Sequence, residues 1–419
     1  MEQFFFGRKI SIYVFIVVLV WLFVLMGMSV MKNQNKIAYS EADKKILLLI
    51  SIIVLSDVAS LIHFNGFELY STKHIQRLGA DMMSVKYKFL IFPLLLLYVL
   101  FVKRFVGKIY VLRSLLFSSI VSSAILYLKL IGLLPVAGYS IGNLQVYTNY
   151  AAKYIRYSGG EIDPNFYFVS IVVGLISLLL LRGEMHKRTF LLFFLCLSFS
   201  LIFTYSRSGL LFYFLAIIIS GIVAVVDKIK KSKDIFKVDV KIYFFLVIFC
   251  GIYLLYSKDI SIFLIDGVHG LIEKTINENS EGNYGGGRLD QLISSIDYIL
   301  SVPLLYKVIG SGYNVVLNMQ LWEFLLYEYT GKYYYVYNDI HNTYLSVLVT
   351  VGVLGFAVLT MILKKYLACV YKEDIYAFVF SLALMLMAMT VNVTILFSFW
   401  FIVLFYDFDD KNKSCIING

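Results

Sequence analysis

Long apolar runs separated by short polar stretches make up most of the sequence. A helix needs about 20 mainly apolar residues to cross a bilayer, and several runs reach that length. The pattern therefore predicts an all-α, polytopic integral membrane protein with about 11–12 transmembrane helices. The predicted spans are Ile10–Met31, Ile46–Ile62, Phe89–Val102, Ile109–Leu134, Phe166–Leu181, Thr189–Phe203, Leu210–Val226, Ile242–Tyr256, Thr343–Leu363, Ile375–Val391 and Ile395–Tyr406.

One polar stretch, residues 257–341, is far longer than the other connections. We expect it to form a single large extracytoplasmic loop and to carry the chemistry, since working residues concentrate on loops held by a rigid scaffold. The loop divides the chain into three predicted parts. These are N-terminal transmembrane helices (1–256), the loop (257–341), and C-terminal transmembrane helices with a cytoplasmic tail (342–419).

Composition and charge support a membrane protein and predict its orientation. Hydrophobic residues make up 60% of the sequence and charged residues 15%, well below the share in soluble domains. The net charge is +10, yet residues 257–341 hold ten acidic and five basic residues. Basic clusters lie instead in short connections at 103–108, 182–188 and 228–241. The positive-inside rule places these clusters in the cytoplasm, so 257–341, 135–165 and Tyr205–Gly209 are expected outside.

The side of the N-terminus stays open. Eleven spans would leave it outside, although Arg8 and Lys9 favour the cytoplasm. Either a further span lies within residues 64–88, or the four lysines of the first loop determine the orientation. Because the basic clusters are dispersed between spans, we expect no nucleic-acid partner.

The sequence offers few ligands for a metal or cofactor. Its four cysteines and five histidines are scattered, without metal-ligand spacing, and it has no Walker loop or dinucleotide-binding motif. We therefore expect no metal and no cofactor. A secondary transporter remains an alternative, because inverted repeats can escape inspection. Such a protein would carry its key charges inside the spans, where Asp57, Arg113 and Lys129 lie.

Two short motifs lie at predicted outer ends of spans. Asp163–Phe166 (DPNF) pairs a capping aspartate with a proline suited to the first turn of a helix. Ser206–Gly209 (SRSG) is predicted to be a hairpin between two spans, and Arg207 within it needs water or a partner. The planar fork of an arginine binds phosphate bidentately. The alternative is that Arg207 anchors to lipid headgroups.

Two further motifs belong to the large loop. Gly285–Arg288 places three glycines and an arginine ahead of apolar positions with helical spacing, from Leu289 to Leu300. A helix N-terminus beside an arginine suits a phosphate, and the alternative is a flexible turn with a solvated charge. His341–Tyr344 (HNTY) ends the loop, and histidine is the usual proton shuttle near neutral pH. The alternative is an interfacial histidine.

Tyrosines precede the last motif. Tyr333–Tyr337 has four tyrosines in five positions, and Trp322 lies upstream. Aromatic faces with hydroxyl edges suit sugar rings, but they also suit the interfacial belt of any membrane protein. Tyr335 and Tyr337 are therefore candidate sugar contacts.

Together the motifs resemble the O-antigen ligase/polymerase superfamily of bacterial membrane glycosyltransferases. The resemblance runs from Asp163 to Phe356, nearly half the chain, and the N-terminal spans match only in being hydrophobic. The chain departs from the family pattern in lacking the aromatic that often follows the loop arginine. The matching pieces are DPNF at 163–166, YSRSGLL at 205–211, GGGR at 285–288, VIGSGYNVV at 308–316 and HNTYLSVLVTVGVLGF at 341–356.

The resemblance implies a GT-C-like fold in the bacterial plasma (inner) membrane. It implies a metal-independent enzyme that polymerises undecaprenyl-pyrophosphate-linked oligosaccharide repeat units into O-antigen or capsular polysaccharide, or, as the alternative, a ligase. Membrane lipid and a chain-length regulator protein are the other expected partners. The implied catalytic residues are Arg207 and Arg288, which stabilise the pyrophosphate, and His341, which deprotonates or positions the acceptor hydroxyl. The candidate substrate-binding residues are Asp163, Asn165, Asp290, Asp339, Asn342, Tyr335 and Tyr337.

Overall fold

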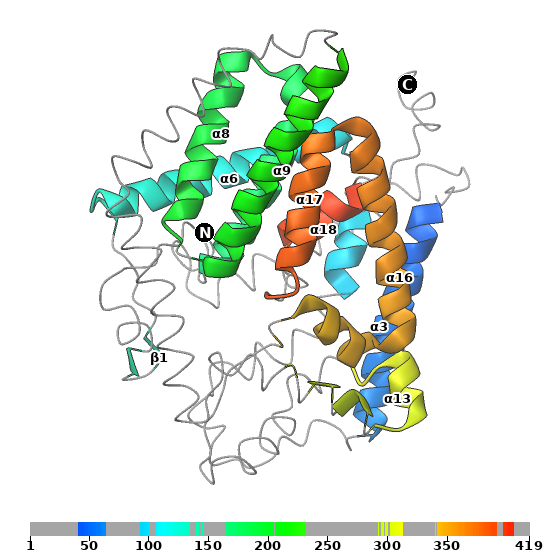
Figure 1. Cartoon of the computed structure of the whole chain (residues 1–419). Coiled ribbons are helices and arrows are strands. Elements are labelled where there is room, and N and C mark those ends of the chain that lie inside the picture. Colours follow the sequence, from blue (N-terminus) through cyan, green and yellow to red (C-terminus); the bar gives the residue numbers. More distant parts are fainter. Residues whose placement is uncertain are drawn as a thin grey trace, which may run out of the picture. The chain divides into compact units, whose positions relative to one another are not determined.

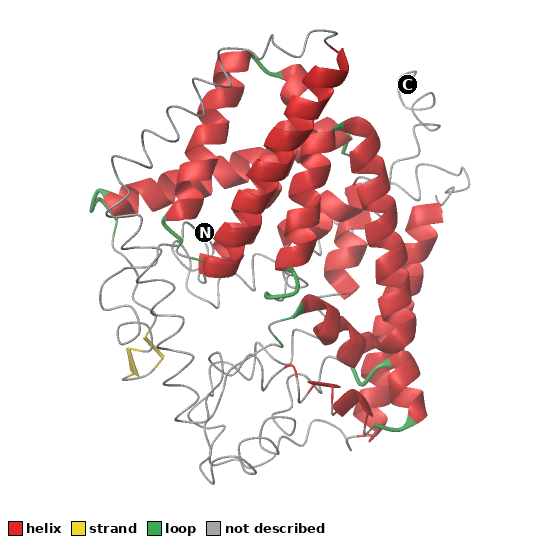
Figure 2. Cartoon of the chain, viewed as in Figure 1, coloured by secondary structure: helices red, strands yellow, loops and turns green. Residues whose placement is uncertain are grey.

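The residues that the computed structural model describes lie almost wholly in helices (Figures 1 and 2). The only strands within the part of the chain it describes are the two-residue β1 (Ser140–Ile141) and β2 (Leu144–Gln145), which pair antiparallel. The all-α prediction is therefore confirmed. The described residues are 41–63, 93–100, 106–134, 140–141, 144–145, 164–204, 206–231, 292, 295–296, 298–300, 302–312, 340, 342–391 and 397–405.

The chain divides into two compact units. The first comprises Met1–Leu215, Val302–Met319 and Asp339–Gly419, and the second comprises Ala216–Ser301 and Gln320–Asn338. Helix α9 (Arg207–Lys231) begins in the first unit and continues into the second. The other described helices of the first unit are α3 (Glu41–His63), α6 (Lys108–Leu130), α7 (Pro164–Leu180), the 3₁₀ helix η2 (Arg182–Glu184), α8 (Lys187–Ile202), α13 (Leu304–Ile309), α16 (Thr343–Glu373), α17 (Ile375–Met387) and α18 (Phe397–Phe405).

Helix α7 lies at the centre of the first unit. Its sequence is apolar all round, which is typical of a helix with no solvent-facing side. Tyr167, Phe168, Val169 and Ile171 are fully buried. Helices α6, α8, α17 and α18 pack around α7. The Ser119 hydroxyl of α6 donates a hydrogen bond to the Ser170 carbonyl at 3.0 Å.

The predicted spans agree with the described helices to within a few residues at most ends. Helices α3, α6, α7, α8, α9, α17 and α18 each coincide with one predicted span, and residues 93–100 are helical within another. Helix α9 begins at Arg207, so the expected turn at Tyr205–Gly209 is shorter than predicted. The predicted spans Ile10–Met31 and Ile242–Tyr256 lie outside the described residues.

Two described helices, α6 and α16, are long and apolar enough to cross a membrane by length and composition. Helices α7, α9 and α17 contain shorter apolar stretches. Many large apolar side chains on the outer helices are exposed, such as Leu192 on α8 and Leu211 on α9, at 63% and 64%. Exposed apolar surface on several helices fits contact with lipid rather than water.

Helix α16 is longer than predicted and is interrupted. It continues to Glu373, ten residues beyond the predicted Leu363, and Gly352 has φ 64° and ψ −170°. At that break the carbonyls one turn earlier lose their helical N–H donors. The backbone N–H groups of Ser311 and Gly312 donate instead to the carbonyls of Val349 and Thr350, both at 2.9 Å. The two carbonyls at the break therefore receive their hydrogen bonds from a segment of the predicted large loop.

Both glycines at this junction are needed for space and for conformation. Gly310 has φ 84°, and a β-carbon there would lie 2.3 Å from the Thr350 carbonyl oxygen. A β-carbon on Gly352 would lie 2.4 Å from the Gly310 nitrogen and the Val308 oxygen. These neighbours are backbone atoms, which cannot swing aside. Residues 302–312 of the predicted loop are thus packed against α16.

Gly352→Ala is expected to destabilise the folded protein by about 2 kcal/mol or more, from the positive φ together with the backbone overlap. Thermal unfolding of the purified protein in detergent measures the effect as a lower Tm. Gly221→Ala is the matched control, because a β-carbon there meets nothing within 4 Å and the residue lies inside α9. An equal Tm for the two variants would contradict the backbone junction.

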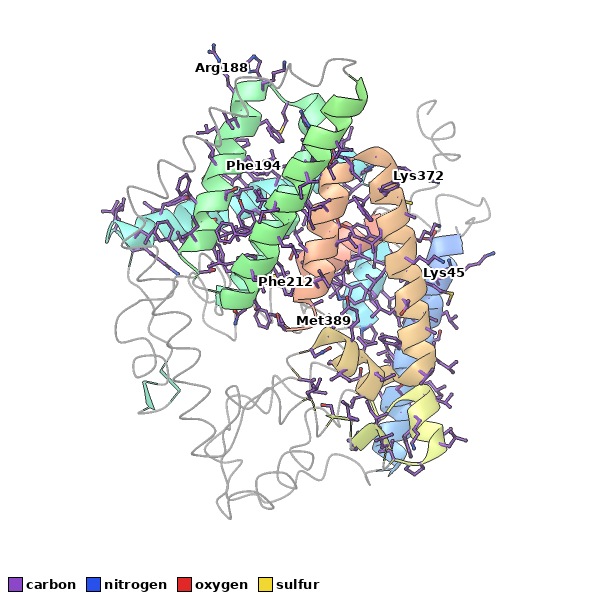
Figure 3. The ribbon with its side chains drawn as sticks, in the orientation of Figure 1. Lys45, Arg188, Phe194, Phe212, Lys372 and Met389 are labelled. Carbon is purple, nitrogen blue, oxygen red and sulfur yellow. The ribbon has the colours of Figure 1, made fainter. Side chains whose placement is uncertain are left out.

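One end of the first unit gathers basic side chains. Lys108 at the start of α6 pairs with Glu373 at the end of α16. The Arg182 guanidinium, just after α7, lies 5.9 Å from the Phe190 ring of α8 and 6.0 Å from the Tyr376 ring of α17. Arg188 projects from the same end of α8 in Figure 3. We call this the basic end.

Candidate functional site

The end of α17 opposite the basic end holds the start of α16. The Thr343 backbone N–H donates to the Ala388 carbonyl at 2.8 Å, and the Thr343 hydroxyl donates to the Val391 carbonyl at 2.7 Å. The Tyr344 hydroxyl reaches the Met385 carbonyl at 2.9 Å. Three hydrogen bonds therefore fix the first turn of α16 on the last turn of α17 and on the turn that follows it.

Asn342 caps α16. Its Oδ1 accepts hydrogen bonds from the backbone N–H groups of Tyr344 and Leu345 at 3.0 and 3.1 Å. Asparagine is among the preferred residues at this position because it satisfies N–H groups that the helix leaves without partners. The candidate Asn342 therefore has a structural role at the point where the chain leaves His341.

The turn that follows α17 also holds the start of α9. The Thr390 hydroxyl lies 3.1 Å from the Ser208 hydroxyl and 2.9 Å from the Met387 carbonyl. Ser206, on the other side of Arg207, donates from its hydroxyl to Asn165 Oδ1 at 2.9 Å. The chain at Arg207 is therefore held on both sides, by Ser208 to the turn after α17 and by Ser206 to α7.

A close helix crossing supports these contacts. Gly209 lies against the Phe168 ring, and a β-carbon at Gly209 would approach ring atoms to 2.8 Å. The Ser206 carbonyl accepts the first helical hydrogen bond of α9 from the Leu210 N–H at 2.8 Å. The small residue lets α9 approach α7 closely, so that Ser206 reaches Asn165.

Three predicted motifs thus meet around one turn, residues 388–391. We call this the motif end. Helices α7, α9 and α16 all begin there, at Pro164, Arg207 and Thr343. Each helix N-terminus carries a partial positive charge, although the first three N–H groups of α16 are already paired with Ala388 and Asn342. Such an arrangement favours an anionic group.

The motif end and the basic end are opposite ends of the same helices. Helices α7 and α16 run from the motif end to the basic end, and α8 and α17 run back. Met389 in Figure 3 marks the α17 side of the motif end, and Arg188 lies toward the other end of the unit. Among the described residues, Asn165, Ser208 and Asn342 therefore lie at the end opposite Lys108, Arg182 and Arg188.

The structure describes only part of the predicted site. Asn165, Arg207 and Asn342 lie in described elements, and of Arg207 only its place as the first residue of α9 is described. Helical residues at 292, 295–296 and 298–300 agree with the helix expected after Arg288. The predicted site residues outside the described part are His341, Arg288, Asp163, Asp290, Asp339, Tyr335 and Tyr337.

Comparison with known families gives one match, over part of the chain. Residues 191–360 match the sequence model of the family described as O-antigen ligase. The matched range is less than half of the chain, and it confirms the resemblance seen in the motifs. Members of the matched family are membrane proteins and glycosyltransferase-like enzymes. A comparison with curated proteins finds no match.

The motif end extends beyond the range that matches the O-antigen ligase family. The matched range contains Arg207, the glycine-arginine motif at 285–288 and His341–Tyr344, whereas Asn165 precedes it and Thr390 follows it. Sequence reasoning missed Thr390, which lies at the end of a predicted span. The available signal was a polar pair, Thr390 and Asn392, between two apolar runs.

Proposed function

We propose that the chain is a polytopic inner-membrane glycosyltransferase that polymerises undecaprenyl-pyrophosphate-linked oligosaccharide repeat units into O-antigen or capsular polysaccharide. The observation that carries the proposal is the meeting of three helix N-termini at the motif end, with Arg207 at one of them. The leaving group of such a transfer is a pyrophosphate held at the membrane surface. Positive helix ends and arginines at that depth stabilise its developing charge.

The proposed reaction uses residues from three motifs. The bond between the anomeric carbon of the growing glycan and its pyrophosphate breaks, and the acceptor hydroxyl oxygen of the next repeat unit forms a bond to that carbon. His341 takes or positions the acceptor proton. Arg207 and Arg288 bind the departing lipid pyrophosphate through bidentate hydrogen bonds, without a metal.

The remaining candidates are proposed to bind the sugars. Asp163 and Asn165 precede or begin α7, and Asp290 and Asp339 supply carboxylates in the large loop. Tyr335 and Tyr337 offer aromatic faces, and Asn342 positions His341 by capping α16. A chain-length regulator protein is a proposed partner.

A ligase is the second candidate, because the matched family is described as O-antigen ligase. A ligase would transfer the glycan to a lipid or protein acceptor rather than to another repeat unit. Lipid-linked glycans from a deletion strain distinguish the two. We expect single repeat units to accumulate, as for a lost polymerase, whereas accumulation of long lipid-linked chains would indicate a ligase. Trapping of repeat units in the cytoplasm would indicate a transporter.

The proposed topology places the motif end outside and the basic end in the cytoplasm. Single cysteines at positions 389 and 188, in a background without the four native cysteines, report the two ends. An impermeant thiol reagent on intact cells is expected to label Met389→Cys and spare Arg188→Cys. A permeant reagent that labels both is the control for reactivity. The reverse impermeant pattern would invert the topology.

A further inference from the structure

A groove at the basic end lies apart from the motif end. It has a volume of about 350 Å³ and lies between α6, the α7–η2 connection and α8. Its apolar lining includes Leu116, Phe117, Ile120 and Phe193. Phe117 is 68% exposed, so the groove opens on the outside of the helix bundle. This volume is within the range of small-molecule sites.

Two opposite charges stand on the rim of this groove. Arg113 Nη2 lies 4.0 Å from Glu184 Oε2, and each side chain is more than half exposed. At that distance the pair is an ion pair without a short hydrogen bond. Both groups keep surface available for a third polar group. The charges of Arg113 and Glu184 sum to zero. The nearby residues Arg182, Lys187 and Arg188 are all positively charged.

We propose that this groove binds one diacyl phospholipid whose headgroup carries a phosphate and a primary ammonium, as in phosphatidylethanolamine. An acyl chain fills the apolar groove, the phosphate accepts hydrogen bonds from Arg113, and the ammonium donates to Glu184. The charges are complementary, because the adjacent guanidinium of Arg113 and carboxylate of Glu184 match the phosphate and the ammonium of a zwitterionic headgroup. A choline headgroup has no N–H donor for the carboxylate.

The site is independent of glycan transfer and lies on different helix ends. Arg113 is inside the predicted span Ile109–Leu134, where a charge is expected to have a partner or a polar ligand. Glu184 supplies one opposite charge, and the headgroup supplies the second. Such a lipid would fix the connection between α7 and α8, whose other ends belong to the motif end.

Native mass spectrometry of the purified full chain tests the proposal. Phosphatidylethanolamine, phosphatidylcholine and phosphatidylglycerol with the same acyl chains are supplied in equal amounts. We expect one phosphatidylethanolamine to be retained in preference to the other two. Arg113→Gln should lower that retention about tenfold, the loss of a charge-assisted contact. Arg188→Gln is the matched control, since it removes a nearby positive charge outside the groove.

Two further variants test the recognition of the lipid headgroup and of the acyl chain separately. Glu184→Gln should shift the preference toward phosphatidylglycerol, because the rim then carries a net positive charge. Ile120→Trp should reduce retention of all three lipids by filling the groove. Equal retention of the three lipids by the unmodified protein, a preference for phosphatidylglycerol, or equal losses in Arg113→Gln and Arg188→Gln would overturn the proposal.

Discussion

Replacing His341 with alanine is expected to lower glycan transfer by about 10²–10⁴-fold, the usual contribution of a group that moves a proton in the reaction. The neighbours of His341 are both held. Ile340 is 1% exposed, and Asn342 caps α16. Because the backbone is fixed on either side, the substitution removes the imidazole without releasing the chain. Lipid-linked single repeat units should then accumulate, since their synthesis and export do not depend on this residue.

The measurement is polymer ladder length beside the abundance of the variant in the membrane fraction. His186→Ala is the matched control, because His186 also precedes a helix but caps α8 at the basic end. His341→Gln should retain some activity if positioning the acceptor suffices, and little if a proton is transferred. A normal ladder from His341→Ala would make His341 an interfacial residue and move the search for a base to Asp290 and Asp339.

Replacing Arg207 with alanine is expected to cost about 2–4 kcal/mol of transition-state stabilisation, by analogy with loss of a donor to a developing oxyanion. Arg207→Lys should recover only part of the activity, because an ammonium cannot form the bidentate fork. The hydroxyls of Ser206 and Ser208 bond to Asn165 of α7 and to Thr390 after α17 without the Arg207 side chain, so the start of α9 should persist. Arg288→Ala and Arg288→Lys are expected to behave in the same way.

Arg188 provides the control for charge alone. Arg188→Ala and Arg188→Lys, at the basic end, should leave the ladder unchanged. The ladders are compared at equal protein abundance, so that a folding defect is visible separately. Full-length polymer from both Arg207→Ala and Arg288→Ala would leave these arginines only a headgroup-anchoring role.

The helices can be predicted from the sequence because a helix that crosses a lipid bilayer needs a long apolar run. Helix α7 starts at Pro164, as its Asp-Pro signal predicts, and α16 starts at Thr343, directly after its asparagine cap. The all-round apolar character of α7 agrees with its central position. Such features are local, so each is visible in a few consecutive residues.

The break in α16 is not readable in the same way. An apolar run containing Gly352 is compatible with a straight helix, and its partner segment lies forty residues earlier. What makes the break stable is the docking of Ser311 and Gly312, whose N–H groups replace helical donors. A tertiary contact between two glycine-containing segments leaves no periodic signal in either one.

The sequence predicts that the motifs lie on one side of the membrane, but not that three of them meet at the turn 388–391. Charge patterning placed the motifs on one side, but the turn that joins them, with Thr390, looks like the end of an ordinary span. Its hydrogen bonds join residues far apart in the chain, such as Ser208 with Thr390 and Thr343 with Val391. Hydroxyl pairings of this kind depend on helix packing rather than on sequence spacing.

Reconstitution tests the central claim that the motif end transfers lipid-linked glycan. The purified chain is placed in liposomes with lipid-linked single repeat units as the only glycan, and products are separated by size. The account predicts a ladder of longer glycans with released undecaprenyl pyrophosphate, and almost no ladder from Arg207→Ala or His341→Ala. A ladder of equal length and rate from those two variants, at equal protein content, would contradict it.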